Sequence, residues 1–549
     1  MPFTFNLIHE RWIPCTAAHD GAPLELSLAE VLGRAHEIGE IADSSPLVTA
    51  ALHRLLLALL HRNFGPADQR QWQALWNRRR FDSQALDPYF QRWQERFDLF
   101  HPDRPFYQCG SLDFAYEAPV SKLVHELASG NNPTLFDHTS EQLGTALTAP
   151  SAARCLVAHQ AFAVGGLVSF EKGRDPKLYK SADGAPVVKG AVALVKGRNL
   201  FETLLLNLHR LSAEHGEPFV ASAHDAPAWE RNSETRAEDR FPEGYLDLLT
   251  WQSRRIRLHP EAGETGGAVV RRAVIMKGNQ FPDGWSRHNR ETMLAFRKVL
   301  KPAKGMDPWP AIAFQEDRVV WRDSLALFQS VEEQQARPKT IDWLADLAAA
   351  RILDPSLSLS AELFGLCTDQ ARVLFWRHER LPLPLAYLSE PRLIEKLRLA
   401  LQQAEEVAVD LRAATYELGK LLLATESDRP GAPQPDKKNV RALLDSMSPT
   451  RVYWSRLEVL FARFLVELAA DVTQRDDGSP EYGNVALPAW ELALRRTSAR
   501  ALAELTRSLD SSARSLKAAA MAERSFYRRL AHTLPNPDKQ EEVNRATAQ

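Results

Sequence analysis

Histidine and acidic residues that could hold a metal or move protons are scattered along the chain. Three His-Glu pairs occur, at His9-Glu10, His125-Glu126 and His378-Glu379. None has a second histidine four residues after the first, the spacing that places two zinc ligands on one helical face. The His-Asp dipeptides at 19–20 and 224–225 are isolated, whereas a metal nuclease site needs several converging ligands. These residues are better explained as turn positions.

The sequence also lacks the motifs for nucleophilic catalysis and for phosphate binding. The chain has no G-x-S-x-G elbow, and Gly419-Lys420 is followed by Leu421 within an apolar helical pattern rather than by Ser or Thr. Its four cysteines, Cys15, Cys109, Cys155 and Cys367, form no CxxC pair that could start a zinc site. We therefore expect a non-enzymatic protein with no metal and no cofactor, in a reducing compartment.

Basic residues gather in two regions and indicate binding. Residues 491–530 contain nine Arg or Lys against four acids, a local balance of +5. Such a stripe could follow phosphates, and a solvated helix face is an equally good interpretation. Residues 171–198 carry seven Arg or Lys against three acids, directly after Gly165-Gly166. Glycines let a backbone approach a ligand closely, although a simple turn also explains the pair.

A third basic cluster alternates with an aromatic residue. The segment WQSRRIRL, residues 251–258, places Arg254, Arg255 and Arg257 close to Trp251. Interleaved guanidinium and aromatic groups suit nucleic acid, and they equally suit a strand held by ion pairs.

The elements that position these residues fall into three parts. Phe3, Phe5 and Leu7 alternate as in a strand, and Ser45-Pro46 starts a helix that ends near Gly65. Two aromatic-rich helices are expected between 66 and 110, and mixed helix and strand with long loops between about 130 and 290. One apolar stripe predicts a long helix over 391–424, and further helices begin at Ser448-Pro449 and continue to about 533.

We therefore predict an α+β protein. Residues 1–378 form a large mixed α/β N-terminal domain with long loops, and residues 379–549 form a C-terminal four-helix bundle.

Composition limits the class of protein. The chain has 549 residues, 44% of them hydrophobic, and 68 Lys and Arg against 70 Asp and Glu, which gives a formal charge of −2. This is an ordinary globular composition and excludes a wholesale polycation. The longest apolar run, residues 47–60, is shorter than the roughly 20 residues of a membrane span. The charged N-terminus is unlike a signal peptide, so we expect a cytoplasmic protein with no membrane association.

Seven segments, in this order, resemble one known family. They are NLIHERWIPC, HPDRPFYQ, NNPTLFDH, HQAFAVGG, LLTWQSRRIRL, FGLCTDQARVLF and a helical tail. Together they are similar to the large subunit of the type I-E CRISPR surveillance complex, Cascade (the CasA family). The resemblance implies partners that include CRISPR RNA and other Cascade subunits. It also implies recognition of the protospacer-adjacent motif (PAM) on double-stranded DNA, opening of that duplex, and recruitment of a helicase-nuclease.

The resemblance carries specific roles to several residues. The family's glycine loop, which faces the minor groove of the PAM, corresponds to Gly165, Gly166 and Ser169. The family's lysine finger enters the same groove and corresponds to Lys277, while an ungapped alignment places Asn279 or Gln280 there. A backbone flush against the base edges can exclude the guanine amino group, which is what separates G·C from A·T in this groove.

The family's glutamine wedge, which splits the first base pair, corresponds to Asp369, Gln370 and Ala371. We expect these residues in a turn at the start of a helix, where Asp369 could also act as the helix cap.

The loop that seats on the guide-RNA handle and the neighbouring subunit corresponds to Asn131, Asn132, Leu135, Phe136 and His138. Phe136 would stack on a flipped base or pack on its own domain. In the basic C-terminal stripe, Arg495, Arg496, Arg500 and Arg507 are candidates for non-specific contact with the DNA backbone. The alternative to this whole interpretation is a stand-alone helical nucleic-acid-binding scaffold or an unrecognised nucleic-acid enzyme.

Overall fold

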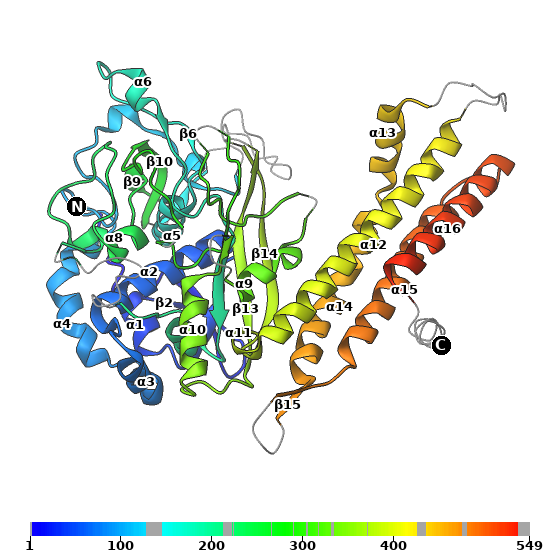
Figure 1. Ribbon diagram of the computed structural model, residues 1–549. Coiled ribbons are helices and arrows are strands. Elements are labelled where there is room, and N and C mark those ends of the chain that lie inside the picture. Colours follow the sequence, from blue (N-terminus) through cyan, green and yellow to red (C-terminus); the bar gives the residue numbers. More distant parts are fainter. Residues whose placement is uncertain are drawn as a thin grey trace. The chain divides into compact units, whose positions relative to one another are not determined.

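The computed structural model describes residues 3–127, 145–211, 222, 224–264, 266–288, 290–303, 306–316, 318–330, 334–369, 372–424, 435–474 and 480–535. The chain divides into two compact units, Met1–Leu385 and Ala386–Gln549. The first combines sheets with helices (Figure 1), so the predicted mixture of helix and sheet is confirmed. The predicted boundary after residue 378 falls inside a strand that pairs with the first unit's sheet, and the division lies after Leu385.

Short, mostly antiparallel sheets make up the strand part of the first unit. One sheet has the order β2-β1-β3, with β1 (Ile13–Ala17), β2 (Pro23–Leu26) and β3 (Ile38–Ile41). A second has the order β4-β10-β5, with β9 also pairing β10; its strands are β4 (Ala118–Pro119), β5 (Leu147–Thr148), β9 (Arg254–Ala262) and β10 (Ala268–Lys277). A third has the order β14-β13-β8, with β8 (Val192–Lys196), β13 (Ser358–Asp369) and β14 (Arg372–Pro384). The remaining pairs are β6 (Gly166–Leu167) with β7 (Ser181–Ala182), and β11 (Phe296–Arg297) with β12 (Gln335–Ala336).

Helix α2 (Pro46–Phe64) lies at the centre of the first unit, and its residues from Leu47 to His61 are all buried. Its start follows the sequence signal: the Ser45 hydroxyl accepts a hydrogen bond from the Val48 amide, and proline occupies the first turn. Gly65 ends it, as predicted. The helices around it are α1 (Leu28–Gly33), α3 (Gln69–Arg78), α4 (Ser83–Trp93), α5 (Ala149–Phe162), α6 (Pro176–Tyr179), α7 (Leu200–Leu206), α8 (Tyr245–Leu249), α9 (Leu325–Phe328) and α10 (Lys339–Ala349).

The predicted strand at the N-terminus is wrong. Leu7 is buried, but residues 3–7 form no strand, and only Asn6 makes an isolated bridge, to Asp98. The Phe5 amide instead donates to the Asp98 carboxylate (2.9 Å) and the Leu7 amide to the Phe97 carbonyl (2.9 Å). The backbone groups of this segment are thus satisfied by the loop after α4 rather than by a sheet neighbour.

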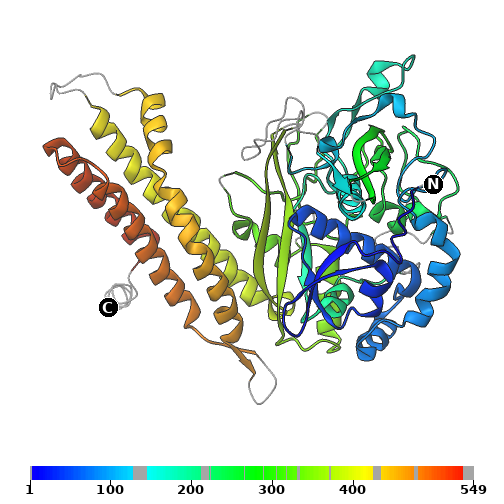
Figure 2. The same cartoon turned by 180° about the vertical axis from the view of Figure 1, so that it is seen from behind.

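The hairpin of β13 and β14 is the longest strand pair described. β13 is buried along residues 361–367 and is the middle strand of its sheet, paired with β8 over residues 360–364 and with β14 along its length. β14 is an edge strand and is half exposed over residues 373–377. The end of this hairpin away from α11 (Ala386–Ser389) lies at the same end of the first unit as β6 and α6 (Figure 1), and Figure 2 shows the same arrangement from behind.

The second unit is helical over most of its described residues. Its helices are α12 (Pro391–Leu423), α13 (Lys437–Met447), α14 (Pro449–Ala470), α15 (Ala486–Arg507) and α16 (Ala513–Thr533), and a hairpin of β15 (Val472–Gln474) and β16 (Pro480–Tyr482) follows α14. The four long helices match the predicted segments, and α12 contacts each of the others. Because α13 also packs on α12, the simple four-helix bundle stays a prediction.

Candidate nucleic-acid interface

The glycine segment, residues 163–184, follows α5 and folds back on itself as a small hairpin. β6 pairs antiparallel with β7, and the amide of Val168 donates to the Lys180 carbonyl at 2.9 Å. Helix α6 lies between the two strands, at the outer end of the first unit (Figure 1). The amide of Ser169 donates to the Ile275 carbonyl (3.3 Å), which ties the segment to strand β10.

Two consecutive glycines stand at the start of this hairpin, and the local geometry requires both. A Cβ on Gly165 would lie 3.1 Å from the Gly184 nitrogen and 3.3 Å from the Ala182 oxygen, closer than most side chains tolerate. Gly166 has a φ of 151°, a conformation that residues with a Cβ rarely adopt. The backbone here is therefore bare because close neighbours crowd a side chain at Gly165 and the backbone conformation disfavours one at Gly166.

A buried polar network holds the glycines in place. The side-chain amide of Gln160 on α5 donates to the Arg254 carbonyl (2.8 Å) and accepts from the Arg254 amide (3.0 Å). The Arg254 guanidinium in turn donates to the carbonyl of Val164 at 2.9 Å, immediately before Gly165. Burial lowers the pKa of Arg254 to about 10, so it stays charged at neutral pH. Arg254 therefore positions the glycine backbone and does not face a ligand.

The other predicted arginines of strand β9 are also engaged within the protein. Arg255 donates to the Lys277 carbonyl (3.0 Å), and Arg257 donates to the Leu112 carbonyl (2.6 Å) while its guanidinium lies 4.3 Å from the centre of the Phe114 ring. Of the two interpretations of WQSRRIRL, the structural one fits these contacts.

Lys277 ends strand β10 beside the glycine segment. Its ammonium donates to the Leu178 carbonyl at 3.2 Å, and it has no acidic partner among the described residues. Ser169 lies close by, because it bridges Met276. Asn279 and Gln280, the alternatives to Lys277, are each 3% exposed. The candidates Asn279 and Gln280 are therefore buried, and Lys277 is the most accessible of the three residues.

Exposed cations and two exposed leucines complete this surface. Lys172, Lys177 and Lys180 are exposed and make no ion pair with a described residue, while Arg174 pairs with Glu171 at 3.0 Å. Leu167 and Leu178 are 78% and 60% exposed. We did not predict the leucines from sequence, because a single leucine in a loop belongs to no recognisable pattern.

The helix start expected at the predicted glutamine wedge is wrong, because a strand begins at Arg372. Asp369 ends β13 and is paired in register with Arg372, the first residue of β14, while Gln370 and Ala371 lie outside the described residues. The run from Arg372 onward includes Val373, Phe375 and Trp376 and pairs along β13, and this non-local pairing overrides a local cap signal. Asp369 therefore caps no helix.

The remaining predicted residues divide between the two units. Asn131, Asn132, Leu135, Phe136 and His138 lie outside the described residues. On α15, the Arg495 guanidinium donates to the Leu534 carbonyl, and Arg500 shares Glu504 with Arg456. Arg496 and Arg507 are exposed and have no ion pair in the part of the chain that the structure describes.

Two cysteine thiols that could act as nucleophiles are largely buried. Burial raises the pKa of Cys109 and of Cys155 to about 12, which keeps both thiols protonated and poorly nucleophilic. Within the described ranges, no cluster of three or more His, Cys, Asp or Glu could hold a metal ion. In the same ranges no helix is long and apolar enough to cross a bilayer.

Comparisons with known proteins define the class. Residues 6–501 match the family described as CRISPR-associated protein Cse1. A curated relative from Thermus thermophilus, CRISPR-associated protein CasA/Cse1, is 35% identical over 539 residues, covering 96% of this chain and 97% of that protein. These matches place the chain among the CRISPR-associated proteins.

Solved structures agree over nearly the full length. The crystal structure of Thermus thermophilus CasA has a TM-score of 0.77 and 31% identity, and the match covers 96% of this chain and 99% of that one. A chain of a CRISPR RNA-guided surveillance complex shares the fold, with a TM-score of 0.73 and 23% identity, over 96% of this chain and 100% of that one. The chain belongs to the Cse1 family, also called CasA, and the resemblance to the Cascade large subunit is confirmed.

Proposed function

We propose that this chain is the non-catalytic large subunit of a type I-E CRISPR RNA-guided surveillance complex, Cascade, acting in the cytoplasm. Its partners would be CRISPR RNA, the other Cascade subunits, PAM-containing duplex DNA and a recruited helicase-nuclease. Membership of the Cse1 family supports the proposal, as does the fold shared with a chain of a CRISPR RNA-guided surveillance complex. The buried state of the thiols supports a binding role over a catalytic one.

The observation that carries the proposal is the bare backbone at Gly165 and Gly166. The buried Arg254–Gln160 network fixes it, and cations without acidic partners flank it. In the minor groove, the guanine amino group is the main feature that distinguishes G·C from A·T. A fixed backbone without side chains can lie against the base edges and exclude that group, while Lys277 reaches into the same groove.

The hairpin of β13 and β14 is a suitable base for opening the duplex. Asp369, Gln370 and Ala371 follow in sequence from β13, the inner strand of this pair, which is buried between β8 and β14. Separating one base step costs a few kcal/mol of stacking, so a wedge needs a rigid support. Pairing of the guide with the target strand would then continue the opening.

The test compares the surveillance complex assembled with and without this chain. We expect the complete complex to bind a PAM-containing duplex more tightly than the complex lacking the chain, and to lose that advantage on a duplex with an altered PAM, as measured by electrophoretic mobility shift. Equal affinity of the two complexes for the PAM duplex would overturn the proposal. Hydrolysis of DNA by the isolated chain with Mg²⁺ would favour the alternative of a nucleic-acid enzyme.

A further inference from the structure

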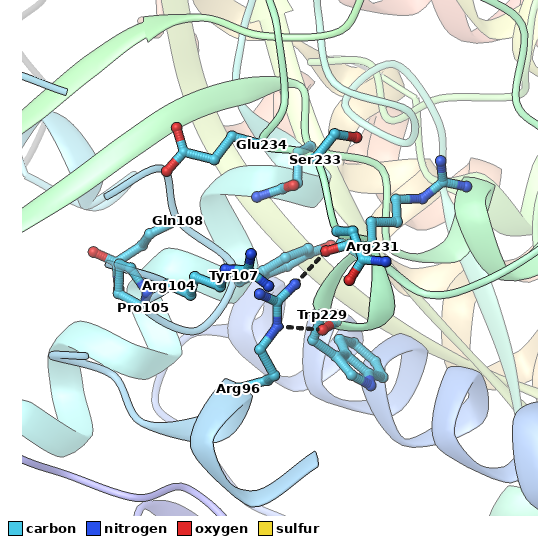
Figure 3. A pocket seen from close by; sticks show the side chains of 12 residues that line it. Arg96, Arg104, Pro105, Tyr107, Gln108, Trp229, Arg231, Ser233 and Glu234 are labelled. Carbon is cyan, nitrogen blue, oxygen red and sulfur yellow. Dashed lines mark hydrogen bonds between the residues drawn. The ribbon is translucent and has the colours of Figure 1, made fainter. Parts of the chain in front are cut away.

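A small polar pocket lies in the first unit, on residues that include none of the glycine segment. Its walls come from the loop after α4, residues 104–108, and from residues 228–234, with Gln252 at the start of the β9 region (Figure 3). The cavity measures about 40 Å³. Since a water molecule needs roughly 10–15 Å³ by the same measure, the space holds about three or four small polar atoms, which is too little for a nucleoside.

Two guanidinium groups in this pocket lack acidic partners. Arg96 is half buried, and its described partners are both neutral: it donates to the Trp229 carbonyl at 2.8 Å and to the Arg231 carbonyl (Figure 3). Arg104 is exposed, and its side chain makes no ion pair with any residue that the structure describes. Burial and the positive charge of Arg104 both lower the pKa of Arg96, so the two cations are close enough to repel each other.

The acidic and remaining basic groups nearby are already engaged. Arg231 pairs with Glu243 and Asp247, each at 3.2 Å, and its guanidinium points away from that of Arg96 (Figure 3). Glu234 lies across the pocket from Arg96 and accepts hydrogen bonds from the amide (3.1 Å) and hydroxyl of Ser111. Ser111 is neutral, so Glu234 keeps its negative charge, and Arg96, Arg104 and Glu234 together leave the pocket with a local balance of one positive charge.

An oxyanion would complete this arrangement. A partly buried cation without a counter-charge is costly, and a second cation beside it adds to the cost. Guanidinium groups match the oxygens of a phosphate, and the neutral polar residues Asn232 and Ser233 also line the cavity. Tyr107, which lines the same cavity, has a φ of 60°, a strained value for a tyrosine and one that recurs at ligand sites.

We propose that this pocket binds a single phosphate group, held between Arg96 and Arg104. The group is either free inorganic phosphate or one phosphodiester of a nucleic-acid strand whose remainder stays in solvent, because both present the same oxygens to the pocket. A phosphodiester is compatible with the position of Gln252, which lies two residues before Arg254, the cross-strand partner of Lys277. The pocket would then hold a backbone phosphate on the sheet that carries the lysine finger.

The first experiment uses the full-length chain and inorganic phosphate, with chloride at matched ionic strength as the reference. We expect phosphate to raise the Tm of the wild type by roughly 2 °C, and Arg104→Gln to abolish that rise. Because Arg104 repels Arg96, the same substitution should leave the Tm in chloride unchanged or higher, whereas loss of a purely structural arginine would lower it. Arg104→Glu should raise the Tm in chloride and also remove the response to phosphate.

The matched control is Arg70→Gln on α3, since Arg70 is exposed, outside the pocket and without an ion pair among the described residues. It should respond to phosphate as the wild type does. The proposal that the pocket binds phosphate would be overturned if phosphate did not raise the Tm of the wild type, or if it raised the Tm of Arg104→Gln equally. This outcome is independent of PAM recognition, because the titration contains no nucleic acid.

The second experiment identifies the source of the phosphate. In the assembled complex, Arg104→Gln should reduce the slope of log affinity for a PAM duplex against log salt by about 0.9 if a backbone phosphate enters the pocket. A phosphate-dependent Tm with an unchanged salt slope would assign the pocket to free phosphate.

Discussion

Two basic regions with similar charge in the sequence differ in how much of that charge is available. In residues 171–198, which overlap the glycine segment, Lys172, Lys177 and Lys180 are exposed and have no ion pair with a described residue. On α15, Arg495 is bound to a carbonyl and Arg500 shares a carboxylate. The comparison shows that a local charge count overstates binding capacity wherever the protein itself supplies partners for the basic groups.

The two regions also differ in what holds them. The glycine segment depends on long-range contacts, because Gln160 and Arg254 are 94 residues apart in the chain. The arginines of α15 depend on one continuous helix, whose spacing places residues 496, 500 and 507 on one face. The first region should therefore be sensitive to changes in the core of its unit, and the second should tolerate most of them.

Low pH should produce the largest difference in stability between the two regions. Burial lowers the pKa of His53 on α2 to about 4 and that of His159 on α5 well below its ordinary value. Below pH 6.5 the unfolded chain takes up protons that the folded chain does not, so stability present above pH 6.5 is lost as the pH falls toward 4. The loss for His53 alone is about 3 kcal/mol.

Hydrogen exchange, corrected for the intrinsic effect of pH, measures this difference region by region. We expect α5 to lose protection between pH 7 and pH 5 before α15 does, since the second unit's single histidine, His532, is exposed. His159→Gln should reduce the pH dependence at α5. Equal loss of protection in the two helices would contradict the expected difference.

The helices were predictable from sequence because their signals are local. Proline at positions 46, 391 and 449 marks the first turn of α2, α12 and α14, and the apolar stripe of α12 continues to Leu423. Helix α13 was missed because it follows a stretch rich in Pro, Asp and Gly that is typical of a helix break. Ser448, predicted to start α14, adopts φ 35° and makes no side-chain cap bond, because it also ends α13.

The contacts that hold the glycine backbone in place were not predictable, because the residues that make them are distant in sequence. In the sequence Arg254 is one of three arginines beside a tryptophan, and only the fold shows that it is buried and bonded to Val164. Two of the seven cations counted between 171 and 198, Lys196 and Arg198, pair with Glu40 and Glu202. The glycine pair itself came from the family resemblance, since two adjacent glycines alone indicate only a turn.

Gly166→Asp should cause the largest loss of DNA binding. The substitution places a carboxylate at a position with φ 151° against the groove, where it is strained and repelled by phosphate. We expect the assembled complex to bind a PAM duplex about 100-fold more weakly, and to bind a target already opened at the PAM nearly as well as the wild type. Electrophoretic shift with both targets measures this.

Gly21→Asp is the matched control for that substitution. Gly21 has a φ of 71°, a Cβ there would meet nothing within 4 Å, and it lies in the turn between β1 and β2. It therefore introduces the same charge at another positive φ without approaching the glycine segment. Equal losses on closed and opened targets for Gly166→Asp would remove the role in PAM reading.

Lys277→Ala should have an intermediate effect. Lys277 has no acidic partner among the described residues, so its charge is available to the DNA, and its removal should weaken PAM-duplex binding by about 10-fold and reduce the salt slope by about 0.9. Lys189→Ala is the control, because Lys189 is exposed but lies outside the glycine segment. If the two variants lose the same affinity, the lysine effect is a general change of charge and the finger role is wrong.

Substitutions on α15 should have the smallest effect and should discriminate between its arginines. Arg496→Gln with Arg507→Gln removes two exposed cations without ion pairs among the described residues, whereas Arg500→Gln removes one that pairs with Glu504, a carboxylate shared with Arg456. If the helix face follows the DNA backbone, the double variant weakens binding about two- to threefold, equally on PAM and non-PAM duplexes, and Arg500→Gln does not. A salt titration of the assembled complex distinguishes the cases. If Arg500→Gln weakens binding as much as the double variant does, pairing with Glu504 does not decide which charges reach the DNA. The contrast between α15 and the glycine segment would then be wrong.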